Sequence, residues 1–298
     1  MYFRAADTFG YADLQGNLHY VGQTLHNLSL SDTGFISYGS VPDHVVFMNT
    51  RGEFQFSIKS FGYPLLDPSG QVQYSINTDR SGLKRIDSEG EILWSMGFSA
   101  PLTTIALAEE ECVVGLMDGR ALVIGAAGEV EHQQTIDGSR IPVMLAAAVS
   151  ADRNRIALIS GIDPQFLSVV QRRDGELITE FNLELSSDFR REVQLRFSPD
   201  TRFLFYEVED GLAVLDVRRR STVEFGAAGV LRSLDSSGEL TAAAFRRAEG
   251  SGLLILRPLD AVILSRELAA EHVYVKVLGG SLILALDDVL LRADLVEG

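Results

Sequence analysis

Paired arginines are the polar residues of this chain whose type and spacing point most directly to chemistry. They occur as Arg172-Arg173, Arg190-Arg191, Arg218-Arg219-Arg220 and Arg246-Arg247, in a chain of formal net charge −15. A guanidinium group binds a carboxylate through two parallel hydrogen bonds, so clustered arginines could bind an acidic partner or a carboxylated ligand. Alternatively, these are outer-strand or turn residues paired with nearby carboxylates, and such pairs contribute little energy. We favour the second interpretation and keep the first open.

Linear motifs for metal binding and catalysis are absent from the sequence. The five histidines lack metal-ligand spacing, and no calcium-loop pattern of alternating aspartates occurs. The single cysteine, Cys112, lies in an apolar run and is expected to be a buried small hydrophobe. No Gly-x-Ser-x-Gly elbow is present, and Gly226-Ala-Ala-Gly229 lacks the Lys-Ser/Thr pair of a phosphate-binding loop. The sequence therefore predicts no metal and no cofactor, and it favours a non-enzymatic role.

The charge balance and the apolar runs limit the classes of partner. A chain this acidic is repelled by phosphate backbones, which argues against nucleic acid as a ligand. No apolar run approaches the roughly 18–20 residues that a membrane-spanning helix needs, so we expect no membrane insertion. No charged segment followed by an apolar export signal comes after Met1.

A repeat of about forty residues runs through the whole chain. One series of polar turns lies at Gly34, Gly70, Glu111, Arg155, Arg202, Gly238 and Gly280, and a second series, out of phase with it, lies at Gly16, Gly52, Gly90, Gly128, Gly175, Arg220 and Asp260. Apolar runs such as 203–206 follow the first series, as expected for strands buried on both faces. Alternating runs such as 52–58 and 90–96 follow the second series, as expected for strands with one wet face.

A period near forty with four strand-length runs per unit predicts an all-β fold, a single β-propeller over residues 1–298. Six internal units are evident. The N-terminal runs 2–6, 11–15 and 17–21 and the C-terminal runs 273–278, 281–286 and 289–295 are expected to combine into one blade that closes the ring, which leaves no exposed sheet edge. We therefore predict seven four-stranded blades, with eight as the alternative.

Two segments resemble the repeats of known propeller families. Leu195–Leu204 followed by Gly211–Arg218 resembles a WD-repeat blade, with Leu215 and Asp216 at the positions of the family's tryptophan and aspartate. Leu83–Trp94 resembles the quinoprotein-type repeat, found in the propeller lipoprotein of the outer-membrane assembly machine. Both resemblances imply a scaffold that binds another protein. The second implies a bacterial periplasmic or envelope location rather than a cytoplasmic one.

The WD-repeat resemblance also implies which loops bind. Loops between blades and loops in the middle hairpin of each blade should crowd one face around the axial channel, and exposed aromatic residues beside arginines are typical of protein interfaces. The candidate partner-binding residues are Phe61, Tyr63, Arg80, Phe98, Arg140, Phe189, Arg190 and His272. The alternative for Phe61, Phe98 and Phe189 is that they pack between blades as wedges.

Two other function classes remain open. A propeller lyase or hydrolase would bring several of Asp79, Asp118, Asp163 and Asp287 together at the channel, with perturbed pKa values. A small-ligand or glycan binder would have a deep channel lined with aromatic residues. We favour a non-enzymatic platform for another protein.

Overall fold

The computed structural model describes residues 1–4, 7–13, 17–24, 26–40, 42, 44–59, 62–67, 70, 73–258, 261–278, 280–287 and 289–294. Within these residues the regular secondary structure consists of strands arranged in eight antiparallel sheets, and no helix is present. The prediction of an all-β fold is confirmed. Across the same ranges no helix is long and apolar enough to cross a membrane.

The chain folds into two compact units, each built from more than one segment of the sequence. Unit 1 comprises Met1–Tyr2, Leu25–Val149 and Arg153–Glu192, and unit 2 comprises Phe3–Thr24, Ser150–Asp152 and Val193–Gly298.

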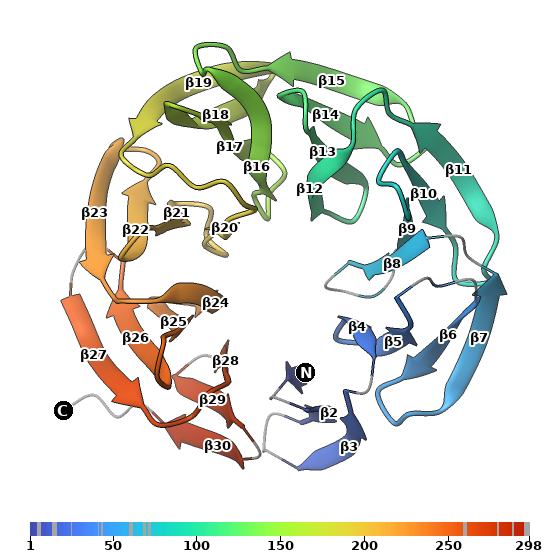
Figure 1. Cartoon of the computed structure of the whole chain (residues 1–298), viewed down its shortest axis with the longest axis vertical. Coiled ribbons are helices and arrows are strands. Elements are labelled where there is room, and N and C mark those ends of the chain that lie inside the picture. The colour runs from blue at the N-terminus through green and yellow to red at the C-terminus, as the bar shows by residue number, and fades with distance from the viewer. Residues whose placement is uncertain are drawn as a thin grey trace. The chain divides into compact units, whose positions relative to one another are not determined.

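The sheets of unit 1 are four meanders of four strands, in which each strand pairs with the next along the chain (Figure 1). Their strands are β4 (Asn27–Leu30), β5 (Gly34–Tyr38), β6 (His44–Asn49) and β7 (Phe54–Lys59); β8 (Gly62–Leu66), β9 (Gln73–Asn77), β10 (Gly82–Ile86) and β11 (Ile92–Gly97); β12 (Leu102–Leu107), β13 (Glu111–Leu116), β14 (Arg120–Gly125) and β15 (Val130–Thr135); and β16 (Ile141–Val149), β17 (Arg155–Ile162), β18 (Gln165–Arg173) and β19 (Glu176–Leu185).

Unit 2 contains two further sheets of four strands and the strands from both ends of the chain. The four-stranded sheets are β20 (Leu195–Phe197), β21 (Phe203–Val208), β22 (Gly211–Asp216) and β23 (Ser221–Gly226), then β24 (Val230–Ser237), β25 (Leu240–Arg246), β26 (Ser251–Arg257) and β27 (Ala261–Leu268). The terminal sheets have three strands each: β1 (Tyr2–Arg4), β2 (Thr8–Ala12) and β3 (Leu18–Gln23), and β28 (Val273–Leu278), β29 (Ser281–Leu286) and β30 (Val289–Asp294).

The terminal strands correct the predicted blade count. The six internal units are present, but the two ends form separate sheets instead of one composite blade, so the described residues form eight sheets, as the alternative predicts, and not seven. Short hairpins pair β2 with β3, and β29 with both β28 and β30. Closing a short hairpin costs less chain entropy than bringing the two ends of the chain into one sheet. The terminal sheets meet instead by side-chain packing, since buried Phe3 lies against Ala285.

Burial along the strands follows the predicted pattern. All six residues of β13 and of β22 are buried, whereas exposed and half-buried residues alternate along β7, β11 and β15. Burying an aliphatic or aromatic side chain contributes about 1.5–3 kcal/mol, so the middle strands supply most of the stability of each sheet. The fourth strand of each of these sheets is therefore the outer strand, and its free edge faces solvent.

Unit 1 contains the single cysteine and the single tryptophan of the chain, and both are positioned by packing between neighbouring sheets. Cys112 is fully buried, as predicted, and burial raises the pKa of its thiol to about 12. Trp94 on β11 crosses to the next sheet, where its Nε1 donates to the Ala126 carbonyl at 3.0 Å. The indole contacts Gly128 in the turn before β15. A single tryptophan therefore joins the sheets β8–β11 and β12–β15.

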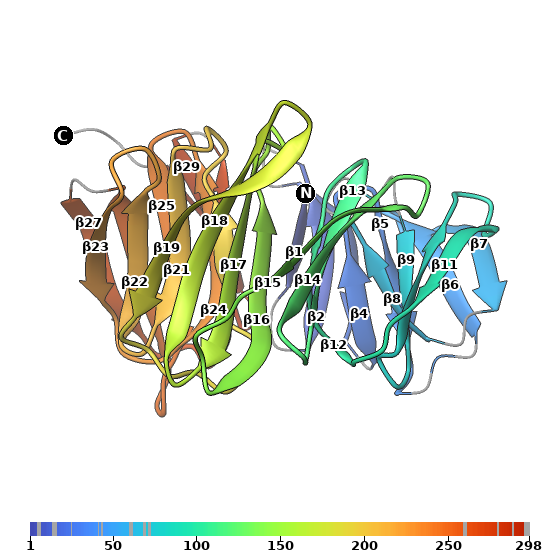
Figure 2. The ribbon, with the colours of Figure 1, turned by 90° about the horizontal axis from the view of Figure 1, so that it is seen from above.

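In each unit the strands run between two opposite edges (Figure 2), and hydrogen bonds show which loops share an edge. In unit 1 the loop after β11 binds the turn between β9 and β10, through Phe98 N to Ser81 O at 2.6 Å and Leu102 N to Arg80 O at 2.9 Å. In unit 2, Ala227 N donates to Asp210 O at 2.8 Å. Loops between sheets and turns of the middle hairpins therefore lie together, and we call this edge of each unit the loop edge.

Candidate functional site

A pocket of about 510 Å³ lies at the loop edge of unit 1. We call it the tyrosine pocket, and its polar and aromatic lining comprises Asn27, Tyr38, Tyr63, Arg80, Thr103, Thr104 and Glu192. Tyr38 comes from the end of β5 and Tyr63 from the start of β8, and their ring centroids are 6.4 Å apart at an interplanar angle of 58°. Two strands from neighbouring sheets thus contribute one aromatic wall.

Arg80 lies beside this wall because of an unusual backbone conformation. It ends the turn between β9 and β10 with φ of 58°, in the left-handed region that non-glycine residues rarely adopt. Gly119 occupies the matching position in the next sheet, with φ of 84°. The backbone of Arg80 donates to Asn77 O at 2.8 Å and accepts from Leu102 N at 2.9 Å, which fixes the turn. A long cationic side chain therefore extends from a rigid turn.

Two threonines of β12 and Glu192 complete the pocket. A β-bulge between Leu102 and Thr104 leaves Thr103 unpaired in the ladder, and its Oγ1 donates to Gly115 O at 3.1 Å. Thr104 Oγ1 donates to Glu192 Oε1 at 3.0 Å. Desolvation raises the pKa of the Glu192 carboxyl, although the Thr104 hydrogen bond and the charge of Arg80 act in the opposite direction. The pocket therefore holds a cation and a partly desolvated carboxyl beside two aromatic rings.

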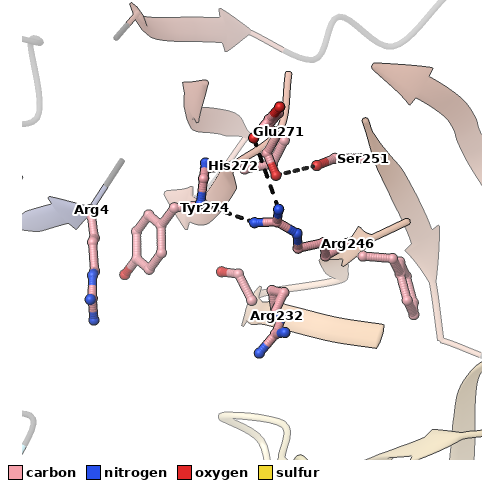
Figure 3. Close-up of a pocket in the computed structure, with 10 residues that line it drawn as sticks. Arg4, Arg232, Arg246, Ser251, Glu271, His272 and Tyr274 are labelled. Atoms are coloured by element: carbon pink, nitrogen blue, oxygen red, sulfur yellow. Dashed lines mark hydrogen bonds and ion pairs between the residues drawn. The ribbon is translucent and has the colours of Figure 1, made fainter. Parts of the chain in front are cut away.

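A second pocket, of about 440 Å³, lies in unit 2 (Figure 3). We call it the arginine pocket, since its lining includes Arg4, Arg232 and Arg246 together with Ser233, Ser251, Glu271, His272 and Tyr274. The side chains come from β1, β24, β25 and β28, the start of β26 and the loop before β28. Phe245 and Val273, which are both buried, form an apolar wall of this pocket.

Hydrogen bonds hold one of the three guanidinium groups in the arginine pocket. Nη1 of Arg246 lies 3.0 Å from His272 Nε2, and its Nη2 lies 3.9 Å from Glu271 Oε2. Because a guanidinium group can only donate, Nε2 must accept, which leaves the proton of a neutral imidazole on Nδ1. That nitrogen lies 3.6 Å from Asp287 Oδ1, and the same carboxylate accepts from the His272 backbone at 2.9 Å.

The structure brings together only some of the candidate residues predicted from the sequence. Tyr63 and Arg80 line the tyrosine pocket, and His272 lines the arginine pocket. Arg140 pairs with Asp163 at 3.0 Å and Arg190 with Asp188 at 3.6 Å, and neither arginine is among the residues that line either pocket. Phe61 lies outside the described residues.

The two described phenylalanines of the predicted set are half-buried. Phe98 packs against the core between β8–β11 and β12–β15, as the wedge alternative predicts. Phe189 lies under Arg191, whose guanidinium carbon is 4.7 Å from the ring centroid, and its carbonyl accepts from Gln165.

Most members of the arginine pairs have carboxylate partners, as the favoured interpretation of those pairs predicts. The pair of Arg172 with Glu111 differs from a weak surface pair, because Glu111 is buried. Arg172 contacts Glu111 and Glu131 at 2.7 and 3.2 Å, Arg219 lies 4.0 Å from Asp216, and Arg247 pairs with Glu267.

The four turn aspartates of the enzymatic alternative each have a separate partner. Asp118 pairs with Arg120 at 2.7 Å, Asp163 with Arg140, and Asp287 with His272. The Ser81 hydroxyl and backbone lower the pKa of Asp79, and Arg120 lowers that of Asp118, which is the opposite of what a general acid needs. Among the described residues, no group of three or more His, Cys, Asp or Glu side chains could hold a metal ion.

Sequence reasoning missed Glu192, Arg4 and Arg232. The last of these lies at a β-bulge in β24, between Leu231 and Ser233. The apolar residues Leu231 and Leu234 are three positions apart, so the two-residue alternation of a regular strand is broken there. That break was the available signal for Arg232. Nothing in the local sequence of Arg4 or Glu192 indicates a pocket.

The chain is similar in sequence to an uncharacterized protein of Treponema pallidum (strain Nichols), with 24% identity over 223 residues. The match covers 74% of this chain and 58% of that relative, so the chain spans less than two thirds of the relative's length.

In fold, the chain is similar to two solved structures. BamB from Moraxella catarrhalis matches with a TM-score of 0.66 and 14% identity, over 96% of this chain and 90% of that one. Dihydro-heme d1 dehydrogenase NirN in complex with DHE matches with a TM-score of 0.64 and 13% identity, over 87% and 63% of the two chains. The family model for β-propeller proteins matches residues 1–298. The repeat, the eight antiparallel sheets and this full-length match agree, and the chain belongs to the β-propeller family.

Proposed function

We propose that this protein is a non-enzymatic platform that binds another protein at the loop edge of unit 1, with the tyrosine pocket as the anchoring site. The observation that carries the proposal is the meeting of Tyr63 and Arg80, beside Tyr38, in one pocket at that edge. Tyrosine and arginine dominate the residues that supply most of the binding energy in protein interfaces.

Rigidity of the pocket supports binding. The Arg80 turn is tied to the loop after β11 by backbone hydrogen bonds, and Thr104 holds Glu192 in place. A surface that is ordered before binding loses little conformational entropy when a partner docks. Arg80 would meet a carboxylate of the partner, and the two tyrosines would receive an apolar or aromatic side chain. The resemblance to quinoprotein-type propellers supports a scaffold role.

The test compares wild type with Arg80→Gly. Glycine adopts the φ of 58° without strain, so this variant should keep its free energy of unfolding within about 1 kcal/mol while losing the guanidinium group. The matched control is Arg153→Gly, because Arg153 has φ of 56° in the turn between β16 and β17, at the opposite edge of unit 1. Tyr63→Ala, checked for intact folding, is the second variant.

Proteins captured from a lysate of the source organism would be identified and purified, then titrated against each variant. We expect a partner whose affinity falls at least about tenfold in Arg80→Gly and Tyr63→Ala and is unchanged in Arg153→Gly. A partner that binds all three variants equally would exclude the tyrosine pocket as the anchoring site. Capture of no partner would contradict the platform itself.

The two tyrosines also favour a second candidate function, the binding of a glycan. Sugars stack on aromatic rings and bond to nearby polar groups, and Asn27, Thr103 and Glu192 lie in the same pocket. Saturable binding of a neutral oligosaccharide that Tyr63→Ala abolishes would establish this alternative.

A further inference from the structure

The arginine pocket of unit 2 contains two guanidinium groups without an internal counter-ion. Within the described ranges, the side chains of Arg4 and Arg232 have neither an ion pair nor a hydrogen bond, whereas Arg246 in the same pocket is held by His272 and Glu271. Both side chains are exposed, and Figure 3 shows both directed to the same side of the pocket, away from Glu271. The pocket thus has two free cationic groups beside a fixed one.

The backbone places Arg232 in the pocket by interrupting the regular pairing of β24 with β25. The β-bulge takes it out of the ladder that β24 forms with β25, since Leu231 pairs with Phe245 and Ser233 with Ala244. A bulge turns a side chain away from the regular alternation of its strand. Its neighbour Ser233 is buried and binds the backbone of Val275 on β28 through N–H···Oγ at 3.1 Å, which fixes β24 against β28 at this point. The bulge is therefore held rigidly by both adjoining strands.

Electrostatics favour an anion at this site. Arg4, Arg232 and Arg246 carry three positive charges, and Glu271 is the one acidic residue among the described residues that line the pocket. Phe245 and Val273 exclude water from part of the wall, which strengthens interactions between charges there. Like charges brought together in this way repel one another unless an anion joins them. The rest of the chain is acidic enough to repel anions, so this pocket differs from its surroundings.

The donors indicate the class of anion. Phosphate sites commonly use backbone N–H groups at helix N-termini or in glycine-rich loops. The described lining of this pocket instead offers guanidinium groups, since the hydroxyl proton of Ser251 is already donated to Glu271 O at 3.2 Å. A planar guanidinium fork matches a planar carboxylate in geometry and charge. The volume of about 440 Å³ lies within the usual range for small-ligand pockets, about 300–1,000 Å³.

We propose that the arginine pocket binds a carboxylate-bearing ligand through Arg4 and Arg232, with Arg246 as the fixed third cation. The carboxylates could belong to a free di- or tricarboxylic acid or to acidic side chains of a polypeptide, and the chemistry of recognition is the same. This inference is independent of the partner proposed for unit 1.

Isothermal titration of the full chain tests the proposal with two probes, citrate for the free acid and a blocked tetraglutamate peptide for the polypeptide. The ionic strength is kept near 0.01 M, where charges are screened only beyond about 30 Å. The variants are Arg232→Gln, Arg4→Gln and Arg232→Lys. The matched control is Arg218→Gln, which removes the same charge from an exposed turn of unit 2 outside the pocket. Inorganic phosphate is titrated as a competing anion.

We expect at least one carboxylate probe to bind, with affinity lowered about tenfold by Arg232→Gln and by Arg4→Gln and less than about twofold by Arg218→Gln. Arg232→Lys keeps the charge but loses the fork, so its affinity should fall between those of wild type and Arg232→Gln. Citrate binding alone would assign the free acid, and peptide binding alone would assign the polypeptide. Three results would overturn the proposal: no binding of either probe, equal binding by all variants, or phosphate binding more tightly than both carboxylates.

Discussion

At the scale of single residues, departures from regular strand geometry place the charged groups of both pockets. Arg80 reaches the tyrosine pocket from a left-handed turn position, and Arg232 reaches the arginine pocket from a β-bulge. The side chains that follow the regular pattern, such as Leu212 and Val214 on β22, are buried between sheets instead. In this protein the repeat supplies the scaffold, and its local irregularities supply the polar groups that could bind a ligand.

Glu192 leads to a prediction about pH. Desolvation raises the pKa of its carboxyl in the folded state, so the folded protein binds this proton more tightly than the unfolded chain does. The resulting stabilisation is complete below the unfolded pKa of about 4.3 and is lost as the pH rises through the folded value. Glu192 is exposed to solvent, which screens the effect, so Glu192→Gln should raise Tm only slightly at pH 7 and leave it unchanged near pH 4. Thermal unfolding at a series of pH values measures this, and a lower Tm at pH 7 would contradict it.

Gly128 leads to a prediction about packing. It has φ of 88°, and a Cβ at this position would lie 2.7 Å from Cγ of Trp94. Gly128→Ala therefore combines left-handed strain with a steric clash, and we expect it to lower the free energy of unfolding by about 2–4 kcal/mol. Urea unfolding followed by circular dichroism gives the value. Gly97→Ala is the control, since nothing lies within 4 Å of its Cβ position, and a similar loss in that variant would refute this explanation.

At the scale of elements, side chains that cross from one sheet to the next hold neighbouring sheets in register. In unit 1, Arg172 on β18 reaches Glu111 on β13 and Glu131 on β15. Glu111 is buried, with 4% of its surface exposed, and burial raises the pKa of its carboxyl while Arg172 lowers it. The ion pair thus keeps a charged carboxylate inside the interface between two sheets.

Breaking this pair should be costly. Arg172→Met leaves the buried carboxylate of Glu111 without its cation, and we expect a loss of about 3 kcal/mol in the free energy of unfolding at pH 7. Protonation of Glu111 removes the uncompensated charge, so the loss should shrink toward pH 4. The double variant Glu111→Gln, Arg172→Met should recover part of the stability. Arg173→Met, which removes the neighbouring exposed arginine, should change stability by less than about 0.5 kcal/mol. Equal losses in Arg172→Met and Arg173→Met would show that the pair is unimportant.

At the scale of the whole molecule, eight sheets of one architecture are distributed over two compact units. Each unit has its own buried clusters, such as the one around Leu116 and Ile124 in unit 1 and the one around Phe205 and Leu254 in unit 2. The sequence predicts a single domain, because the repeat runs through the chain without a linker.

Unfolding followed by two probes tests that prediction. Trp94, the single tryptophan, belongs to unit 1, so its fluorescence follows that unit, whereas far-ultraviolet circular dichroism follows the strands of both. A single domain should give coincident transitions in urea and in heat. Separate transitions, with the fluorescence change confined to one of them, would show two domains that unfold independently.

The sequence determined the all-β class, the six internal sheets and the buried middle strands, because turn residues and the period of hydrophobicity are local properties of the chain. Of the residues predicted to bind a partner, Tyr63, Arg80 and His272 line the two pockets, and their role in binding stays a prediction. The number of sheets at the chain ends depended on which strands pair, and local hairpins proved more favourable than a sheet shared by both ends. The arginine pocket could emerge only in the folded chain. Arg4 and Arg232 lie far apart in the sequence, and packing of Phe3 against Ala285 and of β24 against β28 brings their charges to one site.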